Sequence, residues 1–146
     1  MKKKKVAPPP ATAPADPAQW SDKSQGSVAA SFRKFYTDRA YRCRTCGKDA
    51  LFTAAEQKMA YEVRKTHIDV QRVQCEACWR EGHVVEQKIA ACEGQWAGSK
   101  QALARDAVFL SAWRALLLEH RRYGARHNIA ADNMLRKLLD RAAGAN

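Results

Sequence analysis

The C-terminal third of the chain carries the clearest hydrophobic pattern. Apolar residues recur there every three or four positions in two runs, interrupted at residues 122–125: Leu103, Ala107, Leu110, Trp113 and Leu117, then Ala131, Leu135, Leu138 and Ala142. This is the spacing of one face of an α-helix, and Ser99 and Asn128 are residue types that begin helices. The pattern predicts a helical hairpin over residues 98–143, which packs on itself or on the rest of the protein. The alternative is that its apolar faces serve a partner or a second copy.

The middle of the chain alternates between strand and helix signals. Residues 50–52 (Ala-Leu-Phe) form a short apolar run that suits a strand. Thr53 and Glu56 then have the spacing of a capping box, in which each side chain accepts a backbone N–H at the start of a helix. We expect that helix over about residues 54–65, with Met59 and Val63 on its buried side. Residues 68–73 alternate apolar and polar side chains, which predicts a second strand.

The first 30 residues have a different composition. They contain all five prolines, several lysines, and Trp20 as their only aromatic residue. Such a segment buries too little apolar area to offset the entropy of ordering the chain. The sequence therefore predicts a disordered basic tail over residues 1–30, a compact domain over residues 31–92 and the helical extension over 98–143.

Two Cys-x-x-Cys pairs add candidate chemistry to the middle domain. Cys43 and Cys46 form the first pair, Cys75 and Cys78 form the second, and 28 residues separate the pairs. Each pair can bring two sulfur atoms to one ion from a single turn, which is typical of a structural zinc site. We therefore expect one structural Zn²⁺ bound by all four thiolates. The fifth cysteine, Cys92, is expected to be a small buried or half-buried residue, and the alternative is a reactive thiol.

The residues that follow the two pairs differ. Gly47 comes directly after Cys46, and glycine accepts the positive φ that a zinc knuckle requires. No glycine follows Cys78; Trp79 instead opens a polar run compatible with a helix, whose N-terminal dipole would favour thiolates. One pair on a knuckle and one in the first turn of a helix is the arrangement of a treble clef. The predicted fold is a small α+β zinc-stabilised domain with a treble-clef-like knuckle, a short hairpin and helices.

About residues 36–82 resemble the bacterial "probable zinc-ribbon" domain family of treble-clef type. The resemblance lies in residues 41–48 (Tyr-Arg-Cys-Arg-Thr-Cys-Gly-Lys), 52–62 (Phe-Thr-Ala-Ala-Glu-Gln-Lys-Met-Ala-Tyr-Glu) and 72–78 (Arg-Val-Gln-Cys-Glu-Ala-Cys). It departs from the family at Met59 and Ala60, where family members tend to have bulky aromatic residues. The resemblance implies zinc binding and the fold, and it implies no reaction.

The net charge of +11 points to a polyanionic partner. Nucleic acid attracts such a protein through a salt-sensitive term that does not depend on sequence. We expect RNA, the ribosome or DNA to bind basic and aromatic side chains near the Cys pairs, with Phe35 and Tyr36 as further aromatic candidates: Arg33, Lys34, Arg42, Arg44, Lys48, Arg72, Arg80, Tyr41 and Trp79. The alternatives are a protein-interaction adaptor that uses the C-terminal helices, and a redox-responsive zinc and thiol protein.

The sequence favours no enzymatic class. Four thiolates leave no open position on zinc for a substrate or water. His83 is a surface residue in our interpretation, and His120 and His127 lie outside the zinc-framed segment where a His-based nuclease would need its acid-base group. We expect no small-molecule substrate. No stretch approaches a membrane span, no secretory signal is evident, and paired cysteines suit a reducing cytoplasm, which is the expected location.

Overall fold

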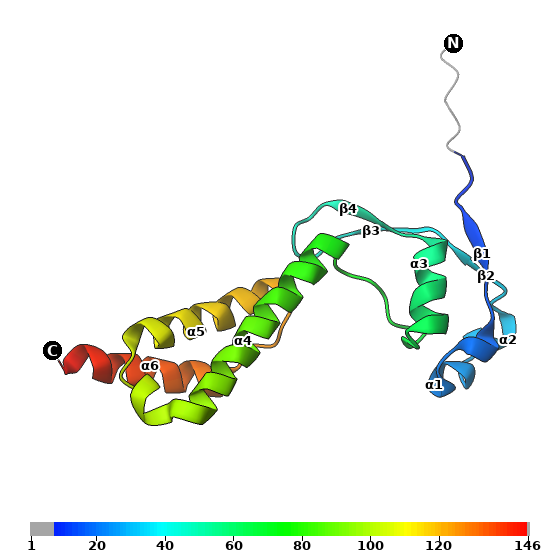
Figure 1. Ribbon diagram of the computed structural model, residues 1–146. Helices are drawn as coiled ribbons and strands as arrows, with labels where there is room; N and C mark the ends of the chain where they lie inside the picture. Colours follow the sequence, from blue (N-terminus) through cyan, green and yellow to red (C-terminus); the bar gives the residue numbers. More distant parts are fainter. Residues whose placement is uncertain (1–7, 146) are drawn as a thin grey trace, which may run out of the picture. The chain divides into compact units, whose positions relative to one another are not determined.

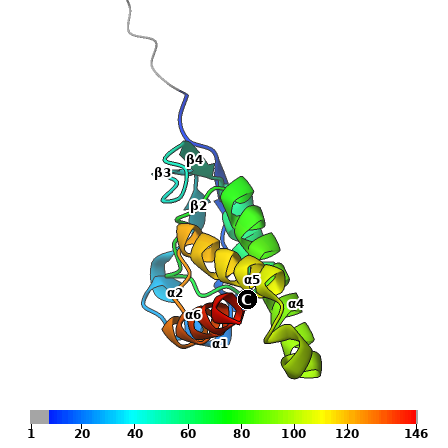
Figure 2. The same ribbon diagram turned by 90° about the vertical axis from the view of Figure 1, so that its left-hand side faces the viewer.

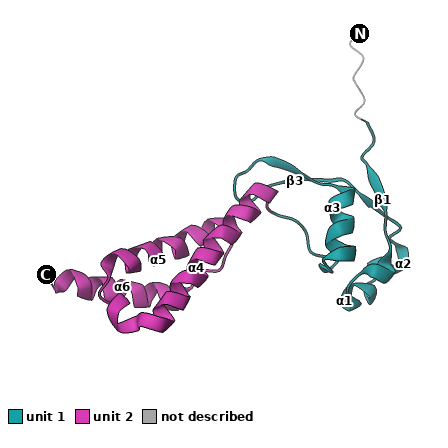
Figure 3. Ribbon diagram, in the orientation of Figure 1, with its two compact units in different colours: residues 1–73 teal, residues 74–146 magenta. Residues whose placement is uncertain are grey.

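The computed structural model of the chain describes residues 8–145 and divides into two compact units, Met1–Val73 and Gln74–Asn146 (Figures 1 and 3). In the described part of unit 1, short strands form two antiparallel pairs. The first pair joins β1 (Thr12–Pro14) to β2 (Phe35–Thr37), and the second joins β3 (Arg39–Arg42) to β4 (Asp49–Phe52). The predicted strand at residues 50–52 is therefore confirmed within β4.

The predicted capping box begins the helix that follows β4. The helix α3 covers Ala54–Lys58, the Thr53 hydroxyl oxygen accepts from the N–H of Glu56 at 3.1 Å, and Glu56 Oε2 accepts from the N–H of Thr53 at 2.9 Å. The next five residues, Met59–Val63, form a π-helical turn labelled η2. A π turn closes hydrogen bonds between residues five apart, so it does not keep the α-helical face.

This turn overturns the predicted buried stripe. Met59 and Val63 are 53% and 65% exposed, whereas Ala60, Tyr61 and Glu62 are buried. The prediction assumed a regular α-helix through residue 65, and the π turn rotates Tyr61 inward instead. Tyr61 then meets Phe52 edge to face, with ring centroids 6.1 Å apart.

The predicted strand at residues 68–73 is also wrong. Within the described residues this segment pairs with no strand, and only Ile68 is buried. A turn in which Val70 donates its N–H to His67 replaces the extended path, and the Tyr61 hydroxyl donates to the carbonyl of Val70 at 3.2 Å. These turn and side-chain contacts satisfy backbone groups that a strand would pair with a neighbouring strand. The alternation of apolar and polar residues alone therefore did not produce a strand.

The N-terminal segment departs from the predicted disorder over residues 12–30. It contains β1, a 3-10 turn η1 (Pro17–Gln19), α1 (Asp22–Gln25) and α2 (Ala29–Phe32). The physical reason is Trp20, which is 2% exposed and joins a core of aromatic and small residues: Ala29, Tyr36, Phe52, Ala54, Ala60, Tyr61 and Ile68. Residues 12–32 therefore belong to the folded unit, and the part of the predicted tail at residues 1–7 lies outside the described residues.

Unit 2 is built on three helices: α4 (Glu76–Leu103), α5 (Ala107–His120) and α6 (Ile129–Gly144). The helix α5 packs against both α4 and α6 (Figures 1 and 2). Its core consists of Val85, Ile89, Leu110, Trp113, Leu117 and Leu135, so the predicted apolar faces of the last two helices are used inside the unit. The helix α4 also runs through the predicted boundary at residues 92–98, which places the start of the helical region at Glu76.

One of the two helix caps that the sequence predicted is present in unit 2, and the other is not. Asn128 caps α6, because its side-chain oxygen accepts from the N–H of Ala131 at 3.1 Å. Ser99 instead interrupts α4 with φ −145° and ψ 41°, and the cap of α5 is Asp106. Arg121–Tyr123 form the 3-10 turn η3, and Gly124, with φ 86°, follows it within the predicted break between the helices. No helix among residues 8–145 has the length and apolar character to cross a membrane.

Candidate metal centre

The first cysteine pair lies on the turn between β3 and β4. The N–H of Cys43 donates to the carbonyl of Lys48, and the N–H of Gly47 donates to the carbonyl of Cys43, both at 2.9 Å. Gly47 has φ 71°, a conformation that side-chain-bearing residues rarely adopt. Arg42 completes the turn by donating its Nε–H to the Gly47 carbonyl at 2.7 Å. The predicted knuckle is therefore confirmed.

The second pair lies at the start of α4. Cys75 is the N-cap residue, and its carbonyl accepts from the N–H of Trp79 at 3.0 Å, so Cys78 lies in the first turn. The start of α4 also places free backbone N–H groups and the positive end of the helix dipole beside this pair. This arrangement, unlike that of the knuckle, needs no glycine after the second cysteine.

The four sulfur atoms form one cluster. Each cysteine offers one ligand atom, and all four Sγ atoms of Cys43, Cys46, Cys75 and Cys78 lie within 4.8 Å of one another. A tetrahedral zinc with Zn–S bonds of 2.3 Å places its sulfur atoms about 3.8 Å apart, so the cluster fits this ion after a small contraction. Cys43 and Cys78 are buried and Cys46 is exposed. The site holds one structural zinc ion with a complete set of thiolate ligands.

The metal ion and the protein chain contribute differently to this site. Cys43, Cys46, Cys75 and Cys78 would hold a Zn²⁺ ion, which would join the four thiolates and give the site a combined formal charge of −2. The residues of the chain supply the geometry: the Gly47 turn aligns the first two sulfur atoms, and the helix start aligns the other two. Because all four coordination positions are filled by cysteine, the arrangement stabilises structure.

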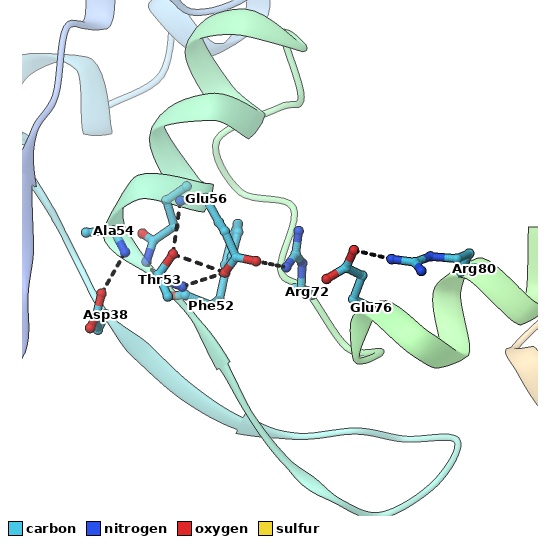
Figure 4. A network of polar contacts seen from close by, with 9 residues as sticks. Asp38, Phe52, Thr53, Ala54, Glu56, Arg72, Glu76 and Arg80 are labelled. Carbon is cyan, nitrogen blue, oxygen red and sulfur yellow. Dashed lines mark hydrogen bonds and ion pairs between the residues drawn. The ribbon is translucent and has the colours of Figure 1, made fainter.

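A polar network holds the residues on either side of α3 (Figure 4). Asp38 Oδ1 accepts from the N–H of Ala54 at 2.7 Å, and Arg72 Nη1 lies 3.2 Å from Glu56 Oε1. The guanidinium of Arg72 also lies over the ring of Phe52, 4.5 Å from its centroid. Burial alone would raise the pKa of Glu56, but the hydrogen bonds from Thr53 and the charge of Arg72 outweigh it and lower that pKa.

Arg72 therefore serves the structure, although the sequence suggested a nucleic-acid contact. It joins Glu56 to the segment that ends at Cys75, and its cation–π contact with Phe52 adds to that link. Sequence reasoning missed this role, and it also missed Asp38, which supports the first turn of α3. The capping-box glutamate was a usable signal, because its second carboxylate oxygen remains available for a cation.

The remaining predicted contact residues fall into three groups. Arg33 is half-buried, whereas Lys34, Arg42, Arg44 and Lys48 are exposed. Arg80 pairs with Glu76 at 2.5 Å on the first turns of α4, and Trp79, 51% exposed, stacks on His83 with centroids 3.9 Å apart. The aromatic candidates of unit 1 differ in access: Phe35 is exposed, Tyr41 is half-buried, and Tyr36 is 1% exposed and unavailable for stacking.

The other candidate side chains lie outside the metal cluster. His83 Nδ1 is 3.1 Å from the carbonyl oxygen of Trp79, in keeping with a surface role. Cys92 is half-buried against the core of unit 2, and burial raises the pKa of its thiol. His127 Nε2 lies 3.4 Å from Asp132 Oδ2, and His120 is half-buried in the same unit.

Comparison with known proteins agrees with this geometry. Residues 37–87 match the family described as a probable treble clef domain, which covers both cysteine pairs, α3 and the start of α4. No curated protein and no solved structure matches the chain. The match bears out the resemblance seen in the sequence and the treble-clef fold class.

Proposed function

We propose that this chain, in which residues 37–87 are a treble clef domain of the matched family, is a structural zinc protein that binds nucleic acid. The proposed role is non-enzymatic, since the metal site is closed by four thiolates. We place it in the cytoplasm, where thiols stay reduced and available to zinc. The partner is RNA, the ribosome or DNA, which share the phosphate chemistry that basic side chains recognise.

One observation carries the proposal. Seven cations that lie close to the cysteine pairs in sequence are candidates, and two of them, Arg72 and Arg80, pair with glutamates. The other five have no carboxylate at ion-pair distance among residues 8–145, and all five belong to unit 1: Arg33, Lys34, Arg42, Arg44 and Lys48. Cations that have no carboxylate partner in the fold can neutralise phosphates and so release counterions from a nucleic-acid backbone.

Three of these five cations, Arg42, Arg44 and Lys48, lie on or next to the knuckle between β3 and β4. Arg42 is held by the Gly47 carbonyl, which fixes its guanidinium beside the turn. Arg44 and Lys48 are exposed on the same turn, so neither is needed to close it. These two residues can therefore be neutralised without removing the contact that shapes the knuckle, which makes them suitable for a test.

The test is binding to mixed RNA and DNA across a salt series. The zinc-loaded protein should bind at low salt and lose affinity as salt rises, with a slope of about 0.7 to 0.9 per phosphate contact. Arg44→Gln/Lys48→Gln should weaken binding and reduce the slope. The matched control is Arg136→Gln/Lys137→Gln, an exposed Arg-Lys pair on α6, which removes the same charge. Absence of affinity at low salt, or a slope near zero, would contradict the proposal.

The structure gives less support to an adaptor that uses the C-terminal helices. Their apolar faces pack inside unit 2, where Leu110, Trp113 and Leu135 are at most 3% exposed. Affinity purification after nuclease treatment separates the two functions. Loss of all bound material favours nucleic acid, and retention of a defined protein favours the adaptor.

A further inference from the structure

The segment between α2 and β2 displays apolar and basic side chains together. Phe32, the last residue of α2, is 63% exposed, and Phe35, the first residue of β2, is 61% exposed. Arg33 and Lys34 lie between the two aromatic residues. Moving a large aromatic side chain out of water lowers the free energy. Two exposed rings only three residues apart in the sequence therefore require an explanation.

The core of unit 1 does not use these rings. The helix α2 turns Ala29 toward the core, whereas Val28 and Phe32, four residues apart, lie on its exposed side. In β2 the strand alternation turns Tyr36 inward and leaves Phe35 and Thr37 outside. The core is closed by other aromatic residues, so Phe32 and Phe35 are surface features of a finished fold.

The outward face of the β1–β2 ribbon is continuous with this display. Phe35 lies opposite Pro14 in the strand register, and both residues are exposed. Lys34 precedes the strand and is exposed, and Arg33 caps α2 with an extended backbone. Within the described part of the chain no carboxylate lies at ion-pair distance from either cation.

We propose that Phe32, Arg33, Lys34 and Phe35 form a stacking platform for unpaired bases, so that the nucleic acid bound by this protein is single-stranded. The proposal rests on the proposed function and specifies its ligand. Bases in a single strand expose flat faces that stack on aromatic rings, while the phosphates between them require cations. A duplex hides those faces, so it could use the two cations and not the two rings.

Two double variants separate the contribution of the aromatic rings from that of the positive charges. Phe32→Leu/Phe35→Leu keeps exposed apolar side chains but removes the aromatic faces. Arg33→Gln/Lys34→Gln keeps the rings and removes both charges. The control for the first pair is Val108→Ala, an 82% exposed apolar residue on α5, and the control for the second is Arg136→Gln/Lys137→Gln on α6. Zinc content and thermal unfolding establish that each variant is folded.

The experiment is fluorescence anisotropy with a short labelled RNA, alone or annealed to its complement, across a salt series. The wild-type protein should prefer the single strand. The leucine pair should weaken single-strand binding by at least about tenfold without changing the salt slope, because stacking on each base contributes substantially. The glutamine pair should lower the slope by about 1.4, at about 0.7 per phosphate. Both controls should leave the single-strand preference unchanged.

Three other results would overturn the stacking platform, and they differ in what they leave of the proposed function. Equal affinity for single strand and duplex, with no effect of the leucine pair, overturns the platform and leaves the proposed function standing. No binding to either RNA overturns both. If the leucine pair leaves RNA binding intact but removes a protein that survives nuclease treatment in a pull-down, the rings dock a protein, and the platform is likewise overturned.

Discussion

Trp20 donates its indole N–H to the hydroxyl oxygen of Tyr36 at 2.7 Å inside the core of unit 1. The same hydroxyl donates its own proton to Glu62 Oε1 at 3.0 Å, and Glu62 Oε1 also accepts from the N–H of Asp16 at 2.8 Å. Burial raises the pKa of Tyr36, so its hydroxyl keeps the proton that this chain of hydrogen bonds needs. The contacts attach the N-terminal segment to the treble clef domain.

Replacing Tyr36 with phenylalanine should destabilise unit 1 by about 1–3 kcal/mol, because the buried indole N–H of Trp20 loses its acceptor. Urea unfolding of the zinc-saturated protein measures the change. Tyr123→Phe is the matched control, since its hydroxyl donates at 3.1 Å to Glu81 on the surface. We expect that variant to lose less than about 0.5 kcal/mol. Equal losses in the two variants would mean that the buried network contributes no more to the free energy of unfolding than a surface hydrogen bond does.

Glu62 should make stability depend on pH in the acid range. Burial alone would raise its pKa, but the N–H of Asp16, the ammonium of Lys58 and the hydroxyl of Tyr36 outweigh burial and lower it. The pKa of the folded state therefore lies below the usual value of 4.5. The stability that ionised Glu62 contributes is complete above that unfolded value and is lost as pH falls through the folded pKa.

The comparison that isolates this contribution is wild type against Glu62→Gln. Their difference in unfolding free energy should stay constant from neutral pH down to about 5.5, then shrink below about 4.5. Acid also protonates the cysteines and releases zinc, but that affects both proteins alike. A difference that stays the same across the acid range would show that the carboxylate charge is not involved.

Two glycines of α4 should respond oppositely to alanine. A Cβ at Gly82 would lie 3.0 Å from the Cβ of Tyr123, whereas a Cβ at Gly94 would have no atom within 4 Å. Alanine is better than glycine in a helix by about 0.8–1 kcal/mol, so Gly94→Ala should stabilise unit 2 by up to that amount. Gly82→Ala gains the same propensity but must displace Tyr123, and we expect a net loss of about 1 kcal/mol or more. Thermal unfolding of both variants decides the comparison.

Zinc content should distinguish the cysteines by position. Cys43→Ser or Cys78→Ser removes a buried thiolate from the cluster and should abolish binding of one zinc per chain at micromolar metal. Cys92→Ser should retain the full zinc content, because that thiol lies against the core of unit 2 and not in the cluster. Metal analysis of the purified proteins gives the answer, and loss of zinc from the Cys92 variant would contradict this assignment.

Chelation of the zinc should affect the two units unequally. The knuckle of β3 and β4 depends on Cys43 and Cys46, so its amide protons should exchange faster without metal. The buried residues that join α5 and α6, Leu117 and Leu135 among them, contain no metal ligand and should lose much less protection than the knuckle. Hydrogen exchange with and without chelator measures both effects, and uniform loss of protection would indicate that one cooperative unit depends on the ion.

The parts of the fold that the sequence predicted are those fixed by local chemistry. The capping box at Thr53, the positive φ of Gly47 and the helix start at Cys75 each follow from the needs of a few adjacent residues. The four metal ligands were predictable for the same reason, because the spacing within each pair is itself the signal. The cap at Asn128 belongs to this group as well.

The errors arose where distant contacts decide the structure. Composition favours disorder near Trp20, yet its indole finds a core and a hydrogen-bond partner in Tyr36, sixteen residues away. Residues 59–63 have ordinary helical propensity, so the sequence did not predict the π turn. The turn accompanies the burial of Tyr61 and Glu62, which depends on contacts with distant residues. Arg72 seemed available for a ligand because sequence does not show that Glu56 and Phe52 meet its side chain.

The helix α4 has a double role that makes metal binding and hydrophobic packing thermodynamically linked. Its first residues supply Cys75 and Cys78, and two turns later the same rigid element supplies Val85 and Ile89 to a hydrophobic core. Anything that frays this helix also lowers the population of the conformation that presents both sulfur atoms, so the apparent zinc affinity falls with it. Conversely, metal ions in the surrounding solution act as a stabilising ligand for a bundle in which no bundle-core residue touches them.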